Sequence, residues 1–293
     1  MGARPNLQKP DFFTEQDIDA VADAIRARVP GFVPRVGLIL GSGLGAVAEA
    51  ASQVRARIPY AELPDWPEAT VKGHAGRLIL GEWAGQPIML MQGRAHYYEG
   101  YTMAQIGLPI RVMRRLGVEV LIVTNAAGAV NPDFAPGDLM LLQDHINFMG
   151  MAGLSPLRGP NLDSFGPRFP DMGRAYDPEL RALARRVAEA KGIEPLWEGV
   201  YVSVAGPQFE TPADLRFLRL IGVDAVGMST VPEVVTAVHS GMRVLGISGI
   251  SNRANLDGKT TTTHEEVLEA GKRITPRMAA LIEGVLAQLA FDA

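Results

Sequence analysis

The chain has 293 residues, of which 47% are hydrophobic and 20% charged, a composition typical of globular rather than disordered proteins. The 28 Lys and Arg against 32 Asp and Glu leave a net charge of −4, which argues against a polyanion such as DNA as the main partner. A small anion needs only one local basic site and is not excluded. The absence of cysteine excludes disulfides, zinc-thiolate sites and a cysteine nucleophile.

The N-terminal segment carries no recognisable targeting signal. Residues 1–13 lack the apolar core of a signal peptide, and no stretch reaches the roughly 18 apolar residues that a membrane span needs. We therefore expect a cytoplasmic protein that binds neither membranes nor nucleic acid.

Helix-like and strand-like segments alternate along most of the chain. In chain order the pattern predicts a helix over 14–29, strands over 36–40, 77–83 and 88–92, a helix over 102–116, strands over 118–123 and 139–146, a helix over 178–191, a strand over 200–204, a helix over 212–220, a strand over 225–228, a helix over 232–240, a strand over 244–250 and a helix over 265–289. Such alternation is typical of a largely parallel sheet with helices on both faces. We expect a single α/β domain over 1–293, in which the irregular stretch 149–174, rich in proline and glycine, forms a long functional loop.

A glycine-rich loop, Gly41–Gly45, directly follows the first predicted strand. Glycines let a backbone approach an anion closely, so the loop is a candidate phosphate site. Together with Ala46 it also fits the dinucleotide fingerprint, which needs an acidic residue about 20 positions later. Glu62 has that spacing, but its surroundings do not resemble a strand end. A phosphate loop, a dinucleotide site and a plain tight turn all remain open here.

Two further strand ends carry groups suited to an anion. After the strand at 88–92, the period of two places Arg94, His96 and Tyr98 on one side, and these offer a forked donor and a titratable one. The small residues of Thr124–Gly128 follow another strand, where main-chain N–H groups can donate to an anion. Solvated side chains at the first site and a simple turn at the second are the alternatives.

The last third of the chain holds residues suited to a planar heterocycle. Phe209 and Glu210 precede a predicted helix and can stack on and hydrogen-bond such a ring, although Glu210 can equally serve the helix N-terminus beside Thr211. Hydroxyl-bearing residues follow the strand at 225–228, and Ser251–Arg253 follows the next one. His264 begins the final helix, where a capping or solvated role is the simpler interpretation.

Eight motifs in one order make the combination specific. They are Gly41–Gly45, Gly73–Arg77, Gln92–Tyr101, Thr124–Gly128, Pro156–Asn161, Ala205–Glu210, Gly227–Glu233 and His264–Val267. In these motifs the chain resembles the trimeric, 6-oxopurine-specific class of purine nucleoside phosphorylases, over essentially its whole length. The resemblance implies a single α/β domain with a central mixed, largely parallel sheet, and a homotrimer.

The same resemblance implies a role for each matching position. The implied phosphate site consists of Ser42, His74, Arg94, His96, Asn125, Ala126 and Ser229. The implied ribose site consists of Tyr98, Met228, His264 and a Phe165 supplied by a neighbouring subunit. The implied purine site consists of Phe209, Glu210, Gly227 and Asn252. The expected catalytic residues are His96, Glu210 and Asn252, with no metal and no cofactor, because inorganic phosphate is a co-substrate. Arg253, where a lysine is common, and the loop 258–263 depart from the family pattern.

These assignments imply reversible phosphorolysis of inosine, guanosine and their 2′-deoxy forms in purine salvage. Phosphate attacks C1′ as the bond to the base breaks, Asn252 binds N7 and O6, and the Glu210 carboxylate accepts the N1–H of a 6-oxopurine. Adenine presents an acceptor at N1, so we expect adenosine to be disfavoured. The alternatives are a methylthioadenosine-type phosphorylase, in which a carboxylate would replace Asn252, an NAD-dependent oxidoreductase built on Gly41–Ala46, and a non-catalytic purine-binding protein.

Overall fold

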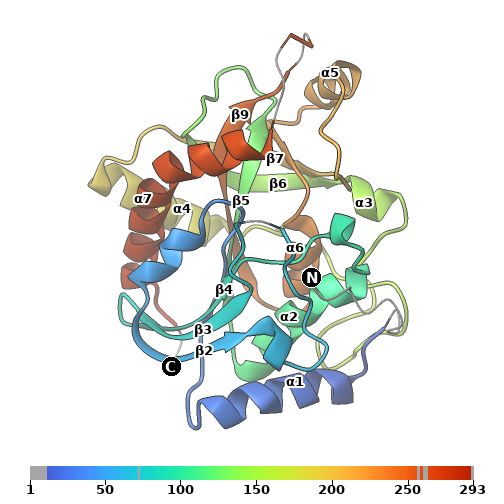
Figure 1. Ribbon diagram of the computed structural model, residues 1–293, viewed down its shortest axis with the longest axis vertical. Coiled ribbons are helices and arrows are strands. Elements are labelled where there is room, and N and C mark those ends of the chain that lie inside the picture. Colours follow the sequence, from blue (N-terminus) through green and yellow to red (C-terminus); the bar gives the residue numbers. More distant parts are fainter. Residues whose placement is uncertain (1–11, 72, 256–257, 260–262, 292–293) are drawn as a thin grey trace.

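The computed structural model describes residues 12–71, 73–255, 258–259 and 263–291. All of its strands lie in one mixed sheet (Figure 1). The strands are β1 (Val36–Ile39), β2 (Ser52–Pro59), β3 (Arg77–Trp83), β4 (Gln86–Gln92), β5 (Val120–Ala129), β6 (Leu139–Asn147), β7 (Leu196–Ser203), β8 (Ala225–Gly227) and β9 (Arg243–Arg253). Their order across the sheet is β2-β3-β4-β1-β5-β8-β7-β6-β9.

The second half of the sheet closes on itself. Strand β9 pairs with both β6 and β5, so β5, β8, β7, β6 and β9 form a ring of hydrogen-bonded strands. Five strand pairings are parallel and four are antiparallel among the described residues. Strands β1, β5 and β9 run parallel to one another, which brings their carboxyl ends to one edge of the sheet.

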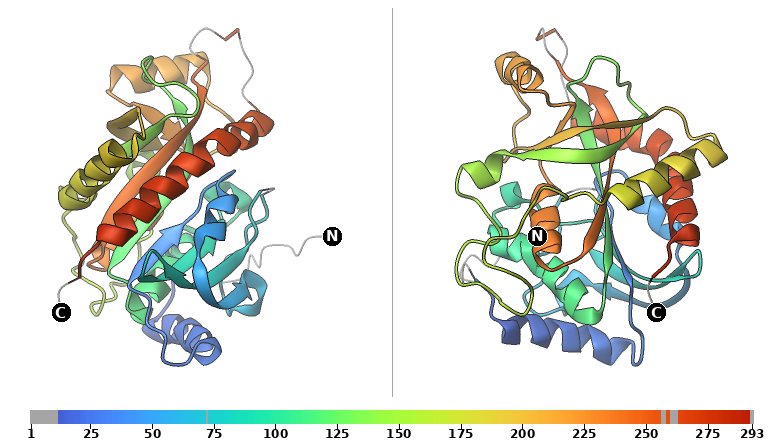
Figure 2. Two further views of the ribbon diagram at one scale, coloured as in Figure 1. Left: turned by 90° about the vertical axis from the view of Figure 1, so that its left-hand side faces the viewer. Right: turned by 180° about the vertical axis from the view of Figure 1, so that it is seen from behind.

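Helices cover the sheet on both faces (Figures 1 and 2). The α-helices are α1 (Glu15–Arg28), α2 (Met103–Leu116), α3 (Phe148–Met151), α4 (Pro178–Lys191), α5 (Pro212–Leu220), α6 (Val231–His239) and α7 (His264–Gln288). The 3₁₀ helices are η1 (Gly45–Ala50), η2 (Tyr60–Glu62) and η3 (Tyr97–Glu99). One apolar core packs α1, α2 and α6 against the sheet, and a second packs α4 and α7 against its other side.

Helix starts follow directly from the sequence. Thr14, Thr102, Thr211 and Thr263 each cap a helix, and the side chain three residues later bonds back to the capping residue. At the other end of α2, Gly117 adopts φ 113°, a conformation that favours glycine. All six predicted helices are present, with bounds that differ by one or two residues at most.

The structure adds elements that the pattern did not predict. Strand β2 was missed because most of its side chains are exposed or half-buried, so it carries no apolar run. The β5 and β9 strands extend beyond the predicted 118–123 and 244–250, as far as Ala129 and Arg253. Their extensions consist of polar and small residues, of which Asn125, Ala126, Gly128, Ser251 and Asn252 line the cavity described below.

The dinucleotide interpretation of the glycine loop is wrong. The loop leads into the short 3₁₀ helix η1 and then into β2, which pairs antiparallel with β3 and does not adjoin β1. Glu62 lies in η2, where its carboxylate bonds Arg28 at 2.9 Å. A dinucleotide site needs an α-helix after the loop and an acidic residue at the end of an adjacent parallel strand, and neither is present among the described residues.

Candidate active site

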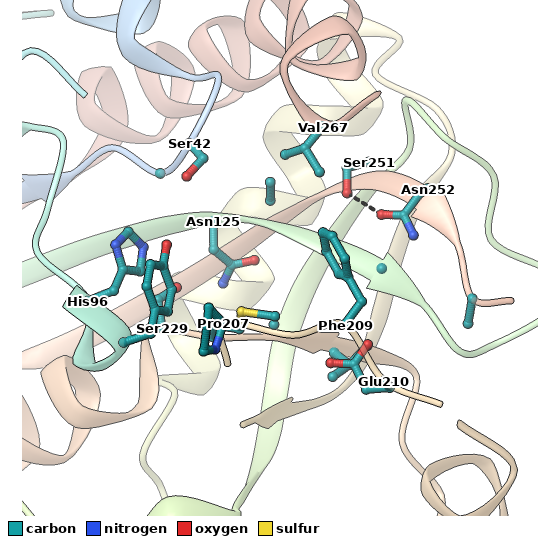
Figure 3. Close-up of a pocket in the computed structure, with 18 of the residues that line it drawn as sticks. Ser42, His96, Asn125, Pro207, Phe209, Glu210, Ser229, Ser251, Asn252 and Val267 are labelled. Atoms are coloured by element: carbon teal, nitrogen blue, oxygen red, sulfur yellow. Dashed lines mark hydrogen bonds between the residues drawn. The ribbon is translucent and has the colours of Figure 1, made fainter. Parts of the chain in front are cut away.

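A cavity of about 510 Å³ lies at the C-terminal ends of β1, β5, β8 and β9 (Figure 3). It is lined by Gly41, Ser42, Val71, His96, Tyr98, Asn125, Ala126, Gly128, Pro207, Phe209, Glu210, Leu215, Val226, Gly227, Met228, Ser229, Ser251, Asn252, Ala254, Asn255 and Val267. Most residues predicted for phosphate, ribose and purine therefore share one cavity, although they come from segments up to 210 positions apart. The exceptions are His74, Arg94, Phe165 and the side chain of His264, which lies outside the described residues.

The glycine loop packs directly on β5. A Cβ atom added to Gly41 would lie 2.7 Å from Asn125 Cα and 3.0 Å from the Thr124 carbonyl oxygen. The Gly41 N–H also donates to Thr124 Oγ1 at 3.2 Å. Glycine is thus needed here for close approach to a strand, which brings Ser42 to the cavity wall.

His74 lies behind Ser42 and fixes the direction of its hydrogen bond. The Arg94 backbone N–H donates to His74 Nδ1 at 3.3 Å, which places the proton of a neutral ring on Nε2. His74 Nε2 lies 3.0 Å from Ser42 Oγ and therefore donates to it. The Ser42 hydroxyl hydrogen is then directed to another acceptor, which suits an anion in the cavity.

His96 lines the cavity and is held by a buried carboxylate. Its Nδ1 lies 2.9 Å from Glu99 Oε1, and its ring stacks on Tyr98 with ring centroids 4.8 Å apart. Burial raises the pKa of Glu99, but hydrogen bonds from His96 and Thr70 outweigh this, and the net effect lowers that pKa. An ionised Glu99 accepts from Nδ1 and leaves Nε2 of His96 for a ligand.

The structure does not place Arg94 as the sequence predicted. Its side chain is only 2% exposed and does not line the cavity. The guanidinium instead donates to Glu233 Oε1 at 2.8 Å, to Thr230 Oγ1 at 3.2 Å and to the Thr124 carbonyl oxygen. Arg94 therefore lies behind the cavity wall that the other predicted phosphate residues form, because it is buried in an ion pair with Glu233. Glu233 lies 139 positions from Arg94 along the chain, and no role was predicted for it.

The opposite end of the cavity carries the predicted purine residues. Thr211 caps α5 together with Asp214, so the cap does not use Glu210, and the capping alternative for Glu210 is wrong. Burial raises the pKa of Glu210 above its usual value of 4.5. Figure 3 shows the Phe209 ring between Glu210 and Asn252.

Asn252 has a defined orientation at the end of β9. Its Oδ1 accepts from Ser251 Oγ at 2.7 Å (Figure 3), and its Nδ2 donates to the Arg253 carbonyl at 3.3 Å. A Cβ added to Gly128 would lie 3.3 Å from Asn252 Nδ2, so this small residue of β5 leaves room for the amide. The amide can present both a donor edge and an acceptor edge to a ligand.

Phe165 does not occupy the position that the sequence predicted. Its side chain is 8% exposed and belongs to the core of its own chain, with the guanidinium groups of Arg111 and Arg115 at 5.1 and 4.9 Å from the ring centroid. A ring held in this way packs within its own chain, which does not favour the predicted contact with a neighbouring subunit. Phe169 in the same loop is 87% exposed.

Comparison with known proteins identifies the family of this chain. Residues 35–287 match the model of the Phosphorylase superfamily. The chain is 50% identical to purine nucleoside phosphorylase 1 of Bacillus subtilis over 271 residues, covering 92% of this chain and 98% of the relative. The chain belongs to the purine nucleoside phosphorylases. Bovine purine nucleoside phosphorylase is 48% identical over 259 residues, covering 87% of this chain and 89% of the relative.

Solved phosphorylase structures share the fold. Purine nucleoside phosphorylase of Schistosoma mansoni in complex with inosine superposes with a TM-score of 0.90 at 41% identity, covering 95% of this chain and 98% of that chain. The same enzyme in complex with adenosine gives a TM-score of 0.91 at 41% identity, covering 95% and 99%. The mixed α/β fold predicted from the sequence is thereby confirmed. None of the described helices has the length and apolarity needed to span a membrane.

Proposed function

We propose that this phosphorylase cleaves the N-glycosidic bond of inosine, guanosine and their 2′-deoxy forms with inorganic phosphate, releasing the base and (deoxy)ribose 1-phosphate. One observation carries the proposal: a single cavity joins donors for an anion, at Ser42, His96 and Ser229, to a carboxylate and an amide at Glu210 and Asn252. The anion donors suit a phosphate ion, and the carboxylate and amide suit the base of a nucleoside. Membership of the family makes the chain a pentosyltransferase.

At the anion end, the proposed chemistry is electrostatic. A phosphate oxygen forms a bond to C1′ as the C1′–N9 bond breaks, through a state in which the sugar carries positive charge. Hydrogen bonds from Ser42, Ser229 and His96 position the phosphate, whose negative charge stabilises that sugar cation. Met228 and Tyr98 also line the cavity and are proposed to contact the ribose.

At the base end, the residues match a 6-oxopurine that leaves with excess electron density. Asn252 is proposed to accept from a protonated N7 through Oδ1 and to donate to O6 through Nδ2. The Glu210 carboxylate is proposed to accept the N1–H. Adenine has no hydrogen at N1, so its binding would leave the half-buried carboxylate of Glu210 unpaired, at a cost of about 1–3 kcal/mol.

Phosphate dependence tests the proposal directly. Hypoxanthine release from inosine is measured by a coupled assay with and without phosphate, and ribose 1-phosphate is identified among the products. We expect release only in the presence of phosphate. Release at the same rate without phosphate would identify a hydrolase, and no release under either condition would favour a purine-binding protein.

We also propose that no metal or cofactor takes part in the reaction. Activity should then survive dialysis against a chelator.

We further propose that the working form is a homotrimer. Apolar side chains exposed on the loop over 149–174, notably Met151 and Phe169, provide surface for association. Light scattering should give three times the chain mass of 31.5 kDa, and a monomeric mass would contradict the trimer.

A further inference from the structure

The backbone of Thr230 is unusual and lies beside the proposed anion site. Thr230 has φ 77° and ψ −52°, and the Val231 N–H donates to the Ser229 carbonyl at 2.9 Å across it, which makes a γ-turn. A β-branched residue rarely adopts positive φ, and such a conformation persists only where surrounding contacts hold it. Its side chain is fully buried.

Three polar groups meet at the Thr230 hydroxyl. Arg94 NH1 lies 3.2 Å from Thr230 Oγ1, and Asn125 Nδ2 lies 2.9 Å from it. Both groups are donors, so they occupy the two lone pairs of the oxygen. The hydroxyl hydrogen must then be donated elsewhere, and Ser229 Oγ lies 3.1 Å away.

The orientation of the Asn125 amide supports this order of bonds. As placed, Asn125 leaves one buried acceptor, Oδ1, without a partner among the described residues. Reversing the amide would put two unpaired N–H donors at that position, which costs more. Arg94 is a donor in every arrangement, since it carries no acceptor.

We propose that Thr230 is a positioning residue that makes Ser229 a hydrogen-bond donor to phosphate. Thr230 donates to Ser229 Oγ, so the hydrogen of Ser229 is directed to the anion in the cavity. His74 acts on Ser42 in the same way, so two serines that line the cavity each accept from a neighbouring side chain and donate to the anion. The inference rests on the proposed function, because it assigns phosphate to this end of the cavity. Glu233 completes the arrangement by holding Arg94 at 2.8 Å.

Steady-state kinetics of matched variants tests the proposal. Thr230→Val keeps the branched shape but removes the hydroxyl, and Thr230→Ser keeps the hydroxyl. We expect Thr230→Val to raise the KM for phosphate about ten- to a hundred-fold, as expected for weakening a hydrogen bond to a charged group. The KM for inosine and both constants of Thr230→Ser should stay within about threefold of wild type.

Thr236→Val is the matched control. Thr236 is equally buried in the following helix, and its hydroxyl donates to the Pro232 carbonyl at 2.8 Å, outside this arrangement. The Thr236→Val variant should leave the KM for phosphate and the KM for inosine unchanged, even if its melting temperature falls. An unchanged KM for phosphate in Thr230→Val would overturn the proposal, as would equal increases in both KM values.

A double variant separates action through Ser229 from general loss of structure. In a Ser229→Ala background, Thr230→Val should raise the KM for phosphate by no more than about threefold. A full additional effect would overturn the relay through Ser229. If Thr230→Val does not fold, Thr230→Ala is used with the same expectations, and the shift of melting temperature by inorganic phosphate reports binding without activity.

Failure of the proposed function is recognised separately. Wild-type enzyme that releases hypoxanthine without phosphate would refute phosphorolysis itself. Wild-type enzyme that depends on phosphate, with a Thr230→Val variant indistinguishable from it, would refute only the role of Thr230.

Discussion

At the scale of single residues, the pKa of Glu210 determines how activity should respond to acid. Only the carboxylate form can accept the N1–H of a 6-oxopurine, and burial raises the pKa of Glu210 above 4.5. The value of kcat/KM for inosine should therefore fall as the pH decreases through this raised pKa, at a higher pH than for an ordinary glutamate.

Replacing Glu210 tests that assignment. Glu210→Ala should lower kcat/KM for inosine by about 10² or more, since a charge-assisted hydrogen bond to the base is lost. The pH profile of Glu210→Gln, which cannot titrate, should lack the acidic limb. A Gln variant that retains the same acidic limb would show that another group titrates there.

Asn252 is predicted to select the substituent at position 6 of the purine. Asn252→Asp replaces the amide donor facing O6 by an acceptor, which favours a 6-amino group. The ratio of kcat/KM for adenosine to that for guanosine should rise by about 10- to 100-fold. Asn255→Asp, at another amide that lines the cavity, is the control and should leave the ratio unchanged. Unchanged guanosine activity in Asn252→Asp would mean that Asn252 does not contact the base.

The positions of site residues in the cavity were predictable where a motif places the residue at a strand end. Ser42, His96 and Asn252 are such cases, and all three line the cavity. The supporting residues were not predictable, because their contacts cross long sequence separations. Arg94 meets Glu233 from 139 positions away, and that buried ion pair is what removes Arg94 from the cavity wall.

At the scale of elements, the contact between the glycine loop and β5 positions Ser42 at the wall of the cavity. Gly41→Ala should destabilise the protein by about 1–3 kcal/mol, because the new methyl group would meet backbone atoms of β5 at 2.7 and 3.0 Å. It should also raise the KM for phosphate by displacing Ser42. Denaturant unfolding and steady-state kinetics measure the two effects.

Gly45→Ala is the matched control for this change. Gly45 lies in the same loop, and its added methyl group would come no closer than 3.8 Å to another residue. We expect its stability to stay within about 0.5 kcal/mol of wild type. Equal effects of the two substitutions would show that the loop tolerates no side chain for reasons other than contact with β5.

Element prediction succeeded where apolar spacing or caps were strong. The bounds of α4 and β3 agree with the predicted 178–191 and 77–83. It failed at β2, whose polar, partly exposed residues form a strand only because β3 provides an edge to pair with. Tertiary context thus decides strands that lack their own apolar face.

At the scale of the whole molecule, the loop over 149–174 places Phe165 in the core of its own chain. Phe165→Ala should destabilise each chain by about 3–5 kcal/mol, because the ring is buried in the core beneath Arg111 and Arg115. Phe169→Ala removes an exposed ring and should change stability by less than about 0.5 kcal/mol.

The two substitutions also distinguish the structure from the sequence-based expectation. Unfolding of each variant is compared with its KM for inosine. A Phe165→Ala variant with unchanged stability and a raised KM for inosine would contradict the buried position and restore the predicted role in a neighbouring site. The single domain, the trimer and the cytoplasmic location stay predictions at this scale.

The sequence by itself determined the alternation of helices and strands, the family, and most residues around the cavity. These depend on local spacing and on motifs that keep their order along the chain. Only the tertiary structure decided the closed ring of strands, the withdrawal of Arg94 to Glu233, the burial of Phe165 and the meeting of Arg94, Asn125 and Ser229 at Thr230. The reason is physical: hydrogen-bond direction and burial depend on which distant groups share a small volume, and local sequence carries no record of that.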